Sequence, residues 1–396
     1  MDINRVPFVL IVALSLAAAA LAAAGDAPPR CDPLPEPPLA PERPETYANT
    51  TPVERVRFFH AGLTAFTRVE TPASGLGPVF NGTSCAACHA APAVGGSSRT
   101  TVARFARTEL RFDAMPERGG PLIQRHGVCT ATCAVAGEVV PIEATRVSLR
   151  DTQPLFGLGL VDAVPDEHIL VRADRLDLDR DGISGKPQFV NGRVGRFGWK
   201  AQIPTLAEFA AVAALNELGI TSPALPAEVA PQGGPVVCDY RADPEDDGSH
   251  VAALTDFMSL LAPLPRRRLS TVARHGRTAF RRVGCTACHV PSLRTGPHVV
   301  RALGERRARI FSDLLLHDMG PELADGMEQG TADGAEFRTA PLMGVAHSAP
   351  YLHDGRAETL EAAIAAHGGE AARSRDRFAR LSPRKQAALS TYLSTL

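Results

Sequence analysis

Cys285-Thr286-Ala287-Cys288-His289, and an earlier copy at Cys85-Ala86-Ala87-Cys88-His89, decide what this chain of 396 residues can fold into. Two thiols at positions i and i+3 lie on one helical turn. There each can add across a vinyl group of haem, and the adjoining histidine can bind the iron. Each copy also follows a Gly-x-x-x-Phe segment, at 62–66 and at 276–280. The sequence therefore predicts two covalently attached c-type haems.

A C-x-x-C pair can instead form a redox disulfide or supply half of a zinc site. Neither alternative accounts for a histidine placed immediately after both pairs. The predicted haem-binding residues are Cys85, Cys88, His89, Cys285, Cys288 and His289, and the two histidines are the predicted proximal iron ligands.

Length and composition favour a two-domain exported protein. A chain of 396 residues exceeds what one hydrophobic core usually serves, and two haem motifs 200 positions apart agree with two domains. The formal net charge of -1 suggests neither nucleic acid nor an anionic membrane as a partner. Proline and glycine are abundant and aromatic residues scarce, which predicts long loops around a modest amount of regular structure.

The first 24 residues have the pattern of a secretory signal peptide. Arg5 precedes an apolar run from Val6 to Leu21, and small residues at 22–24 precede Gly25. We expect cleavage near Ala24, a periplasmic location, and no membrane span after processing; a retained N-terminal anchor is the alternative. Export also agrees with haem attachment and disulfide formation, which both take place outside the cytoplasm.

Four cysteines remain outside the haem motifs: Cys31, Cys129, Cys133 and Cys238. An even number in an oxidising compartment favours disulfides, and four cysteines permit three connectivities. Cys129 and Cys133 are close enough in sequence to bridge locally. That pairing would leave Cys31 with Cys238.

The predicted fold is mainly α, with two c-type cytochrome domains, long loops and a small strand-containing insertion. We expect an extended segment at 25–52, an N-terminal haem domain with insertions at 53–262, and a C-terminal cytochrome c domain at 263–396. Apolar spacing predicts a helix over 53–67, and short apolar alternations predict strands within 99–149. His126 lies in that insertion, where a lone histidine is more often exposed than a ligand.

A weak internal repeat relates the two halves. Trp199-Lys200-Ala201 precedes Thr205-Leu206 and a helix, and 353–357 precedes Thr359-Leu360 and another helix. In single-haem cytochromes c the first and last helices cross closely at a glycine. Gly276, in the helix predicted over 266–283, suits that role against the last helix, which begins near Pro383.

An acidic segment resembles the first half of a calcium-binding loop. Asp177, Asp179 and Asp181 alternate before Gly182, so that their carboxylates could converge on one ion. The bidentate glutamate expected at position 12 is absent, because Gln188 stands there. A carboxylate-rich turn without a metal is therefore the alternative to calcium.

The chain resembles the di-haem oxidoreductases often labelled thiol oxidoreductases, which are relatives of bacterial di-haem cytochrome c peroxidases. The resemblance extends over nearly all of the mature chain and rests on unusual strings that occur in the same order, at 80–89, 154–160, 181–185, 195–201, 312–320, 336–341, 351–357 and 367–370.

In the peroxidase relatives the C-terminal haem accepts electrons and the N-terminal haem reduces hydrogen peroxide. A methionine fourteen residues after the histidine that matches His353 ligates their C-terminal iron, and here that position is His367. The resemblance thus implies His289 and His367 as the two ligands, with Met343 as the second choice. Histidine in place of methionine lowers the reduction potential of such a haem.

The N-terminal haem departs further from the relatives. Their distal histidine would fall at Phe105, so no sixth ligand is evident there. The resemblance implies Trp199 as the tryptophan between the haems and Glu217 as the catalytic carboxylate that moves a proton during O–O cleavage. The alternatives are core packing for Trp199 and an exposed position at the end of a helix for Glu217.

Two classes of function follow. The first is a periplasmic di-haem oxidoreductase with peroxidase-like reduction at the N-terminal haem. Its donor would be a small redox protein or a quinol-linked carrier, and its substrate a small-molecule oxidant. The second is an electron-transfer cytochrome whose two irons are both saturated with ligands. An open distal position at the N-terminal iron separates them. The thiol label itself has no support beyond the four remaining cysteines.

Overall fold

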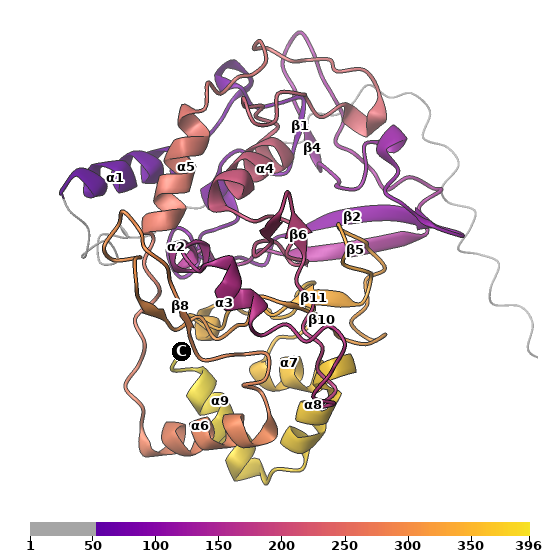
Figure 1. Ribbon diagram of the computed structural model, residues 1–396. Helices are drawn as coiled ribbons and strands as arrows, with labels where there is room; N and C mark the ends of the chain where they lie inside the picture. Colours follow the sequence, from indigo (N-terminus) through magenta and orange to yellow (C-terminus); the bar gives the residue numbers. More distant parts are fainter. Residues whose placement is uncertain (1–52) are drawn as a thin grey trace, which may run out of the picture. The chain divides into compact units, whose positions relative to one another are not determined.

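The computed structural model describes residues 53–396, in which helix exceeds strand, as expected for a mainly α fold (Figure 1). The expected signal peptide at 1–24, the segment at 25–52 and Cys31 lie outside the described residues. Within the described residues, no helix is both long and apolar enough to cross a bilayer.

The first helix pair lies beside the N-terminal haem motif. Helix α1 (Val53–Thr67) packs against α5 (Ser249–Leu260). A Cβ added at Gly62 would lie 2.3 Å from the Ala253 carbonyl oxygen, so only glycine permits this crossing. Phe66 packs on Phe257 of α5 with ring centroids 4.6 Å apart. The contact closes the apolar side of the first haem motif.

The second pair repeats this arrangement. Helix α6 (Thr271–Val283) crosses α9 (Pro383–Leu393), and a Cβ at Gly276 would lie 1.8 Å from the Ala388 carbonyl oxygen. The crossing predicted at Gly276 is therefore confirmed. Phe280 meets Tyr392 edge-on at 5.6 Å, which is the counterpart of the Phe66 contact in the first pair. Two equivalent helix crossings support the internal repeat that the sequence suggests.

Two further helices begin in the same way after the repeated Thr-Leu pairs. The Thr205 side chain accepts a hydrogen bond from Glu208 N at the start of α4 (Leu206–Leu218), and Thr359 accepts one from Ala362 N at the start of α7 (Leu360–Ala366). The remaining helices with α geometry are α2 (Leu158–Asp162), α3 (Asp166–Leu170) and α8 (Ala372–Ala379).

The predicted insertion contains the largest sheet of the described region, with strand order β3-β2-β5. Strands β2 (Thr101–Thr108), β3 (Phe112–Asp113) and β5 (Arg146–Asp151) pair antiparallel. The apolar stretch 138–142, for which a strand was expected, forms none. At its start the Glu138 carboxylate accepts hydrogen bonds from the backbone amides of Gln124 and Gln232. The shorter strands are β1 (Val79–Phe80), β4 (His126–Gly127), β6 (Phe189–Val190), β7 (Arg193–Val194), β8 (Leu293–Arg294), β9 (Arg307–Ala308), β10 (Leu316–Asp318) and β11 (Glu336–Arg338).

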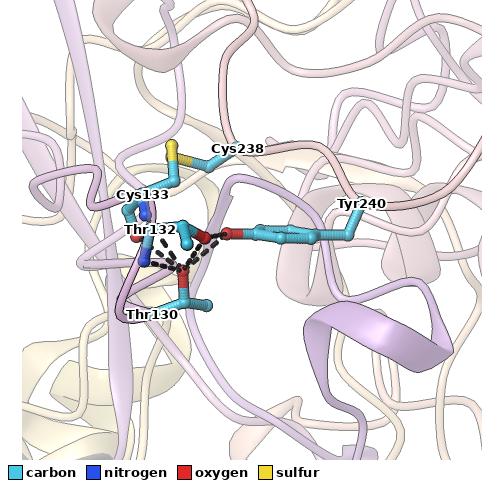
Figure 2. Close-up of a disulfide and its surroundings, with 5 residues drawn as sticks. All are labelled: Thr130, Thr132, Cys133, Cys238 and Tyr240. Carbon is cyan, nitrogen blue, oxygen red and sulfur yellow. Dashed lines mark hydrogen bonds between the residues drawn. A yellow bond between two sulfur atoms is a disulfide. The ribbon is translucent and has the colours of Figure 1, made fainter.

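The predicted local disulfide is wrong. Cys133 bonds to Cys238 across 105 positions of sequence (Figure 2). Cys129 is disulfide-bonded as well. Thr130 and Thr132 beside the bridge both hydrogen-bond the Tyr240 hydroxyl, at 2.5 and 3.2 Å. Closeness in sequence did not predict the disulfide partner of Cys133, because the insertion folds back onto the connection between α4 and α5.

Candidate functional site

Each haem motif lines its own cavity. Cys85, Cys88 and His89 line a first cavity of 270 Å³, and the second motif lines another of 250 Å³. The similar volumes suit two copies of one prosthetic group. The four motif cysteines are unpaired, which leaves their sulfurs available for thioether bonds.

The two motif histidines are held alike. His89 Nδ1 donates to the Gly96 carbonyl oxygen at 3.0 Å, and His289 Nδ1 donates to that of Phe311 at 3.1 Å. Because a carbonyl can only accept, the proton of each neutral ring lies on Nδ1, and Nε2 keeps a free lone pair. Burial lowers the pKa of both rings, that of His289 to about 4, so both are neutral at neutral pH. Neutral imidazole is the form that binds iron.

His367 enters the second cavity at the end of α7. Its Nδ1 donates to the Ala363 carbonyl oxygen at 2.7 Å, which again leaves Nε2 with a lone pair. His289 and His367 line the same cavity, and after burial the charge of His367 is the largest cause that lowers the pKa of His289. Met319 lines the same cavity, whereas Met343, the second choice from sequence, lines the first.

A buried ion cluster supports the second motif and was not expected from the sequence. His317 lies between Asp313, 3.0 Å from its Nε2, and Glu370, 2.6 Å from its Nδ1. Burial alone would lower the pKa of His317. The hydrogen bonds to Asp313, Cys288 and Glu370 instead raise it well above its ordinary value. Because both ring nitrogens of His317 meet carboxylates, neither is free to bind iron. Asp313 and His317 both lie in the segment 312–320, which is one of the segments that resemble the di-haem oxidoreductases.

The first cavity contains polar residues in place of a second histidine. Glu217, in the last turn of α4, lines it, as does Arg104 of β2. Burial raises the pKa of the Glu217 carboxyl, and the neighbouring Asn81 and Arg104 partly offset this. The alternative of an exposed Glu217 is therefore excluded. Among the described residues, Arg104 has no ion pair with a carboxylate within 4.0 Å.

Strand alternation explains why Arg104 was missed. Phe105, where the relatives would place a histidine, is fully buried in a separate cluster with Met115 and Ile123. Successive side chains of a strand point to opposite faces, so Arg104 and Val102 face the first cavity while Phe105 faces away. The apolar alternation over 101–105 indicates that side chains of this strand point to two different faces. It does not indicate which of the two faces lines the cavity.

Trp199 lines both cavities and forms part of the wall between them. Its Nε1 donates to the Asp151 carbonyl oxygen at 3.2 Å, and its ring meets that of His353 edge-on at 6.4 Å. Arg338 lines both cavities too. Its guanidinium donates to the carbonyl oxygens of Gly198 and Thr339 and to the Gln153 side chain.

The acidic loop gathers a different set of residues from the predicted one. Asp174, Asp177 and Asp179 bring carboxylate oxygens within 4.8 Å of one another, and Asp181 is not among them. Asp181 Oδ1 accepts from Ile183 N at 2.8 Å. Gln188, at position 12, is buried and holds the turn at 329–332 through Thr331 N and Ala332 N. The structure thus groups Asp174, and not Asp181, with Asp177 and Asp179, and calcium at this loop stays a prediction.

His126 lies in β4 and stacks on Phe80 with ring centroids 5.8 Å apart. It lines neither of the two cavities. Ligation of iron by His126 has no support.

The donor set of each cavity fits a c-type haem. Each offers two cysteine sulfurs and a neutral imidazole, and the wall between them holds the buried Arg338. Among residues 53–396 no carboxylate forms an ion pair with Arg338, and burial lowers its pKa to about 10. Propionate groups would supply the missing negative charge. Haem fits these residues better than a redox disulfide or zinc does.

Replacing both Cys285 and Cys288 with alanine is expected to halve the covalent haem content. Only the second cavity loses its two attachment points, while Cys85 and Cys88 remain. A pyridine haemochrome assay on the full-length protein measures this as a fall from two haems per chain to one. The matched control is replacement of Cys85 and Cys88. A wild-type ratio of one would contradict the two-haem interpretation.

Comparison with known proteins agrees with the two haem sites. A family model described as "Di-haem oxidoreductase, putative peroxidase" matches residues 140–396. No curated protein matches the chain.

Several solved structures are distantly similar. Hydrazine synthase of Kuenenia stuttgartiensis is 16% identical, with 94% of this chain and 99% of that chain covered and a TM-score of 0.41. The di-haem peroxidase BthA of Burkholderia thailandensis is 16% identical, with coverage of 90% and 89% and a TM-score of 0.42. A MauG-like protein associated with microbial copper homeostasis is 17% identical, with coverage of 92% and 94% and a TM-score of 0.40. These similarities are too distant to assign an activity.

Proposed function

Because the chain belongs to the di-haem oxidoreductase family, we propose that it is a two-haem enzyme that reduces a peroxide at the first cavity with electrons received at the second. The difference between the cavities carries this proposal. The second offers the neutral imidazoles of His289 and His367, and His353 in its wall is stacked on Phe337. The first offers His89 as its one imidazole, together with Glu217 and Arg104. The second iron would thus be saturated with ligands, and the first would keep a position for substrate.

When bound, the haem of the first cavity supplies the iron to which a peroxide binds and through which it receives electrons. Two electrons and two protons convert hydrogen peroxide into two water molecules. Glu217 would hold a proton on its carboxyl and transfer it between the two peroxide oxygens, which requires a carboxyl that can exchange protons near neutral pH. Its raised pKa supports that role.

Arg104 would stabilise negative charge that develops on the departing oxygen. Its guanidinium faces the same cavity as Glu217, and burial lowers its pKa to about 10, so it stays charged at neutral pH. A fixed charge in a cavity of low polarity stabilises such a transition state more strongly than the same charge in water. Phe66, Leu155 and Phe209 line the cavity beside these two groups and limit access of water.

Trp199 would carry electrons between the two haems. It is an aromatic side chain in the wall that the cavities share, and Asp151 and His353 orient its ring. The donor would be a small redox protein or a quinol-linked carrier, and the enzyme would act in the periplasm after removal of residues 1–24. We also propose the domain division at 262/263, because each side contains one glycine helix crossing and one haem motif.

Electron paramagnetic resonance of the oxidised protein tests the proposal. We expect one high-spin iron that binds cyanide, in the first cavity, and one low-spin iron, in the second. Two low-spin irons that ignore cyanide even after half-reduction would favour a di-haem electron carrier without its own catalytic site.

A further inference from the structure

A third cluster of acidic side chains lies in the connection between α4 and α5, apart from both haem cavities. We propose that Glu228, Asp243 and Glu245 form a calcium site that clamps this connection. The site is distinct from the aspartate cluster at 174–179, and the inference does not depend on the proposed peroxidase function.

The three side chains converge. Each offers a carboxylate oxygen, and these oxygens all lie within 4.8 Å of one another. Glu245 is 8% exposed, and its Oε1 is buried without a hydrogen-bond partner; Glu228 Oε1 is buried and unpartnered as well. Within the part of the chain that the structure describes, none of the three forms an ion pair with lysine or arginine. Three converging carboxylates without a countercharge point to a bound cation.

Thr221 and the local backbone hold the other oxygens of these groups. Thr221 N donates to Glu245 Oε2 at 2.7 Å, and Thr221 Oγ1 donates to Asp243 Oδ1 at 3.0 Å and also to Glu245 Oε2. Val229 N donates to Glu228 Oε2 at 3.1 Å. Glu228 and Glu245 are therefore oriented through one oxygen each, while the second oxygen stays available as a ligand. Asp243 is exposed, so water can complete the coordination from that side.

An all-oxygen site with an open side suits calcium best. Calcium accepts 6–8 oxygen ligands in flexible geometry, whereas magnesium demands a near-ideal octahedron. The competing explanation is a proton shared between Glu228 and Glu245. Burial, followed by Glu245 and Asp243, raises the pKa of Glu228 to about 9.

The clamp would stabilise the end of the helix that carries Glu217. Thr221 follows Glu217 by four positions, and Thr221 N is one of the donors to Glu245. The same connection is tied to the insertion by the Cys133–Cys238 disulfide and the Tyr240 hydroxyl, five and three residues before Asp243 (Figure 2). A bound ion would thus join the first half of the connection, at Glu228, to its second half, which the disulfide at Cys238 also holds.

Isothermal titration of the calcium-stripped, haem-loaded protein with calcium chloride tests the proposal. We expect Glu228→Gln and Asp243→Asn each to weaken this site roughly 10–100-fold. Asp239→Asn, at an exposed carboxylate of the same connection outside the cluster, is the matched control and should leave the site unchanged. Magnesium chloride is expected to bind more weakly, and calcium should raise the Tm of the wild type but not that of Glu228→Gln.

The variants also separate the cation from the shared proton. One outcome is that no calcium binds and that Glu228→Gln raises the Tm in the presence of chelator. Glu228 and Glu245 then share a proton, and the proposal is wrong. Calcium that binds Glu228→Gln and Asp243→Asn as tightly as the wild type would also overturn it. Loss of one bound calcium ion per chain in both variants, but not in Asp239→Asn, would establish it. None of these readouts measures peroxide turnover, so they stand whether or not the proposed function does.

Discussion

Glu217→Gln is expected to slow peroxide turnover by roughly 10²–10⁴-fold, the range typical of a lost acid/base group. Glutamine keeps the size of the side chain but cannot exchange the proton. The carboxyl lines the first cavity beside Arg104, and burial raises its pKa, so the substitution removes the group best placed to move a proton there. Steady-state kinetics with a reduced electron donor would measure the change.

Glu208→Gln is the matched control for this variant. Glu208 lies in the first turn of the same helix, is exposed, and interacts with Thr205. Glutamine there should leave turnover unchanged. Haem content and the spectra of both irons should stay nearly the same in both variants, because neither residue is an expected iron ligand. If Glu217→Gln turns over peroxide at the wild-type rate, the carboxyl has no catalytic role.

Local patterns predicted the parts of this fold that depend on neighbouring residues in sequence. The haem motifs, the helices that precede them and the crossing at Gly276 each follow from a short string with a specific physical requirement. A helix crossing this close excludes any Cβ, so a glycine in that position is informative by itself. The repeat of the Thr-Leu helix start likewise follows from its capping geometry.

The parts that depend on distant residues could not be predicted. Cys133 bonds to Cys238 and not to Cys129, because the insertion folds back onto another connection. Arg104 faces the first cavity, and Phe105 does not, because of the direction in which β2 lies. Met343 lines the first cavity although its position in the sequence suggested the second. Strand direction and long-range pairing set these outcomes, and neither has a local signature.

His367→Ala is expected to convert the second iron from low-spin to high-spin without loss of covalent haem. His367 supplies the second neutral imidazole of that cavity, and the Ala363 carbonyl holds its Nδ1 so that Nε2 remains free to bind. Haem attachment depends on Cys285 and Cys288, which the substitution leaves in place. Electron paramagnetic resonance should show one low-spin iron fewer per chain, and added imidazole should restore it.

His347→Ala is the control for this variant, because His347 is an exposed histidine in the same half of the chain. It should leave both irons unchanged. Met319 also lines the second cavity, so a low-spin signal of methionine type in His367→Ala would identify that sulfur as a replacement ligand. His367→Met should raise the reduction potential of the second haem, because methionine in place of histidine favours the reduced iron. A signal of the two-histidine type that survives in His367→Ala would show that another residue ligates this iron, and the assignment of His367 would then be wrong.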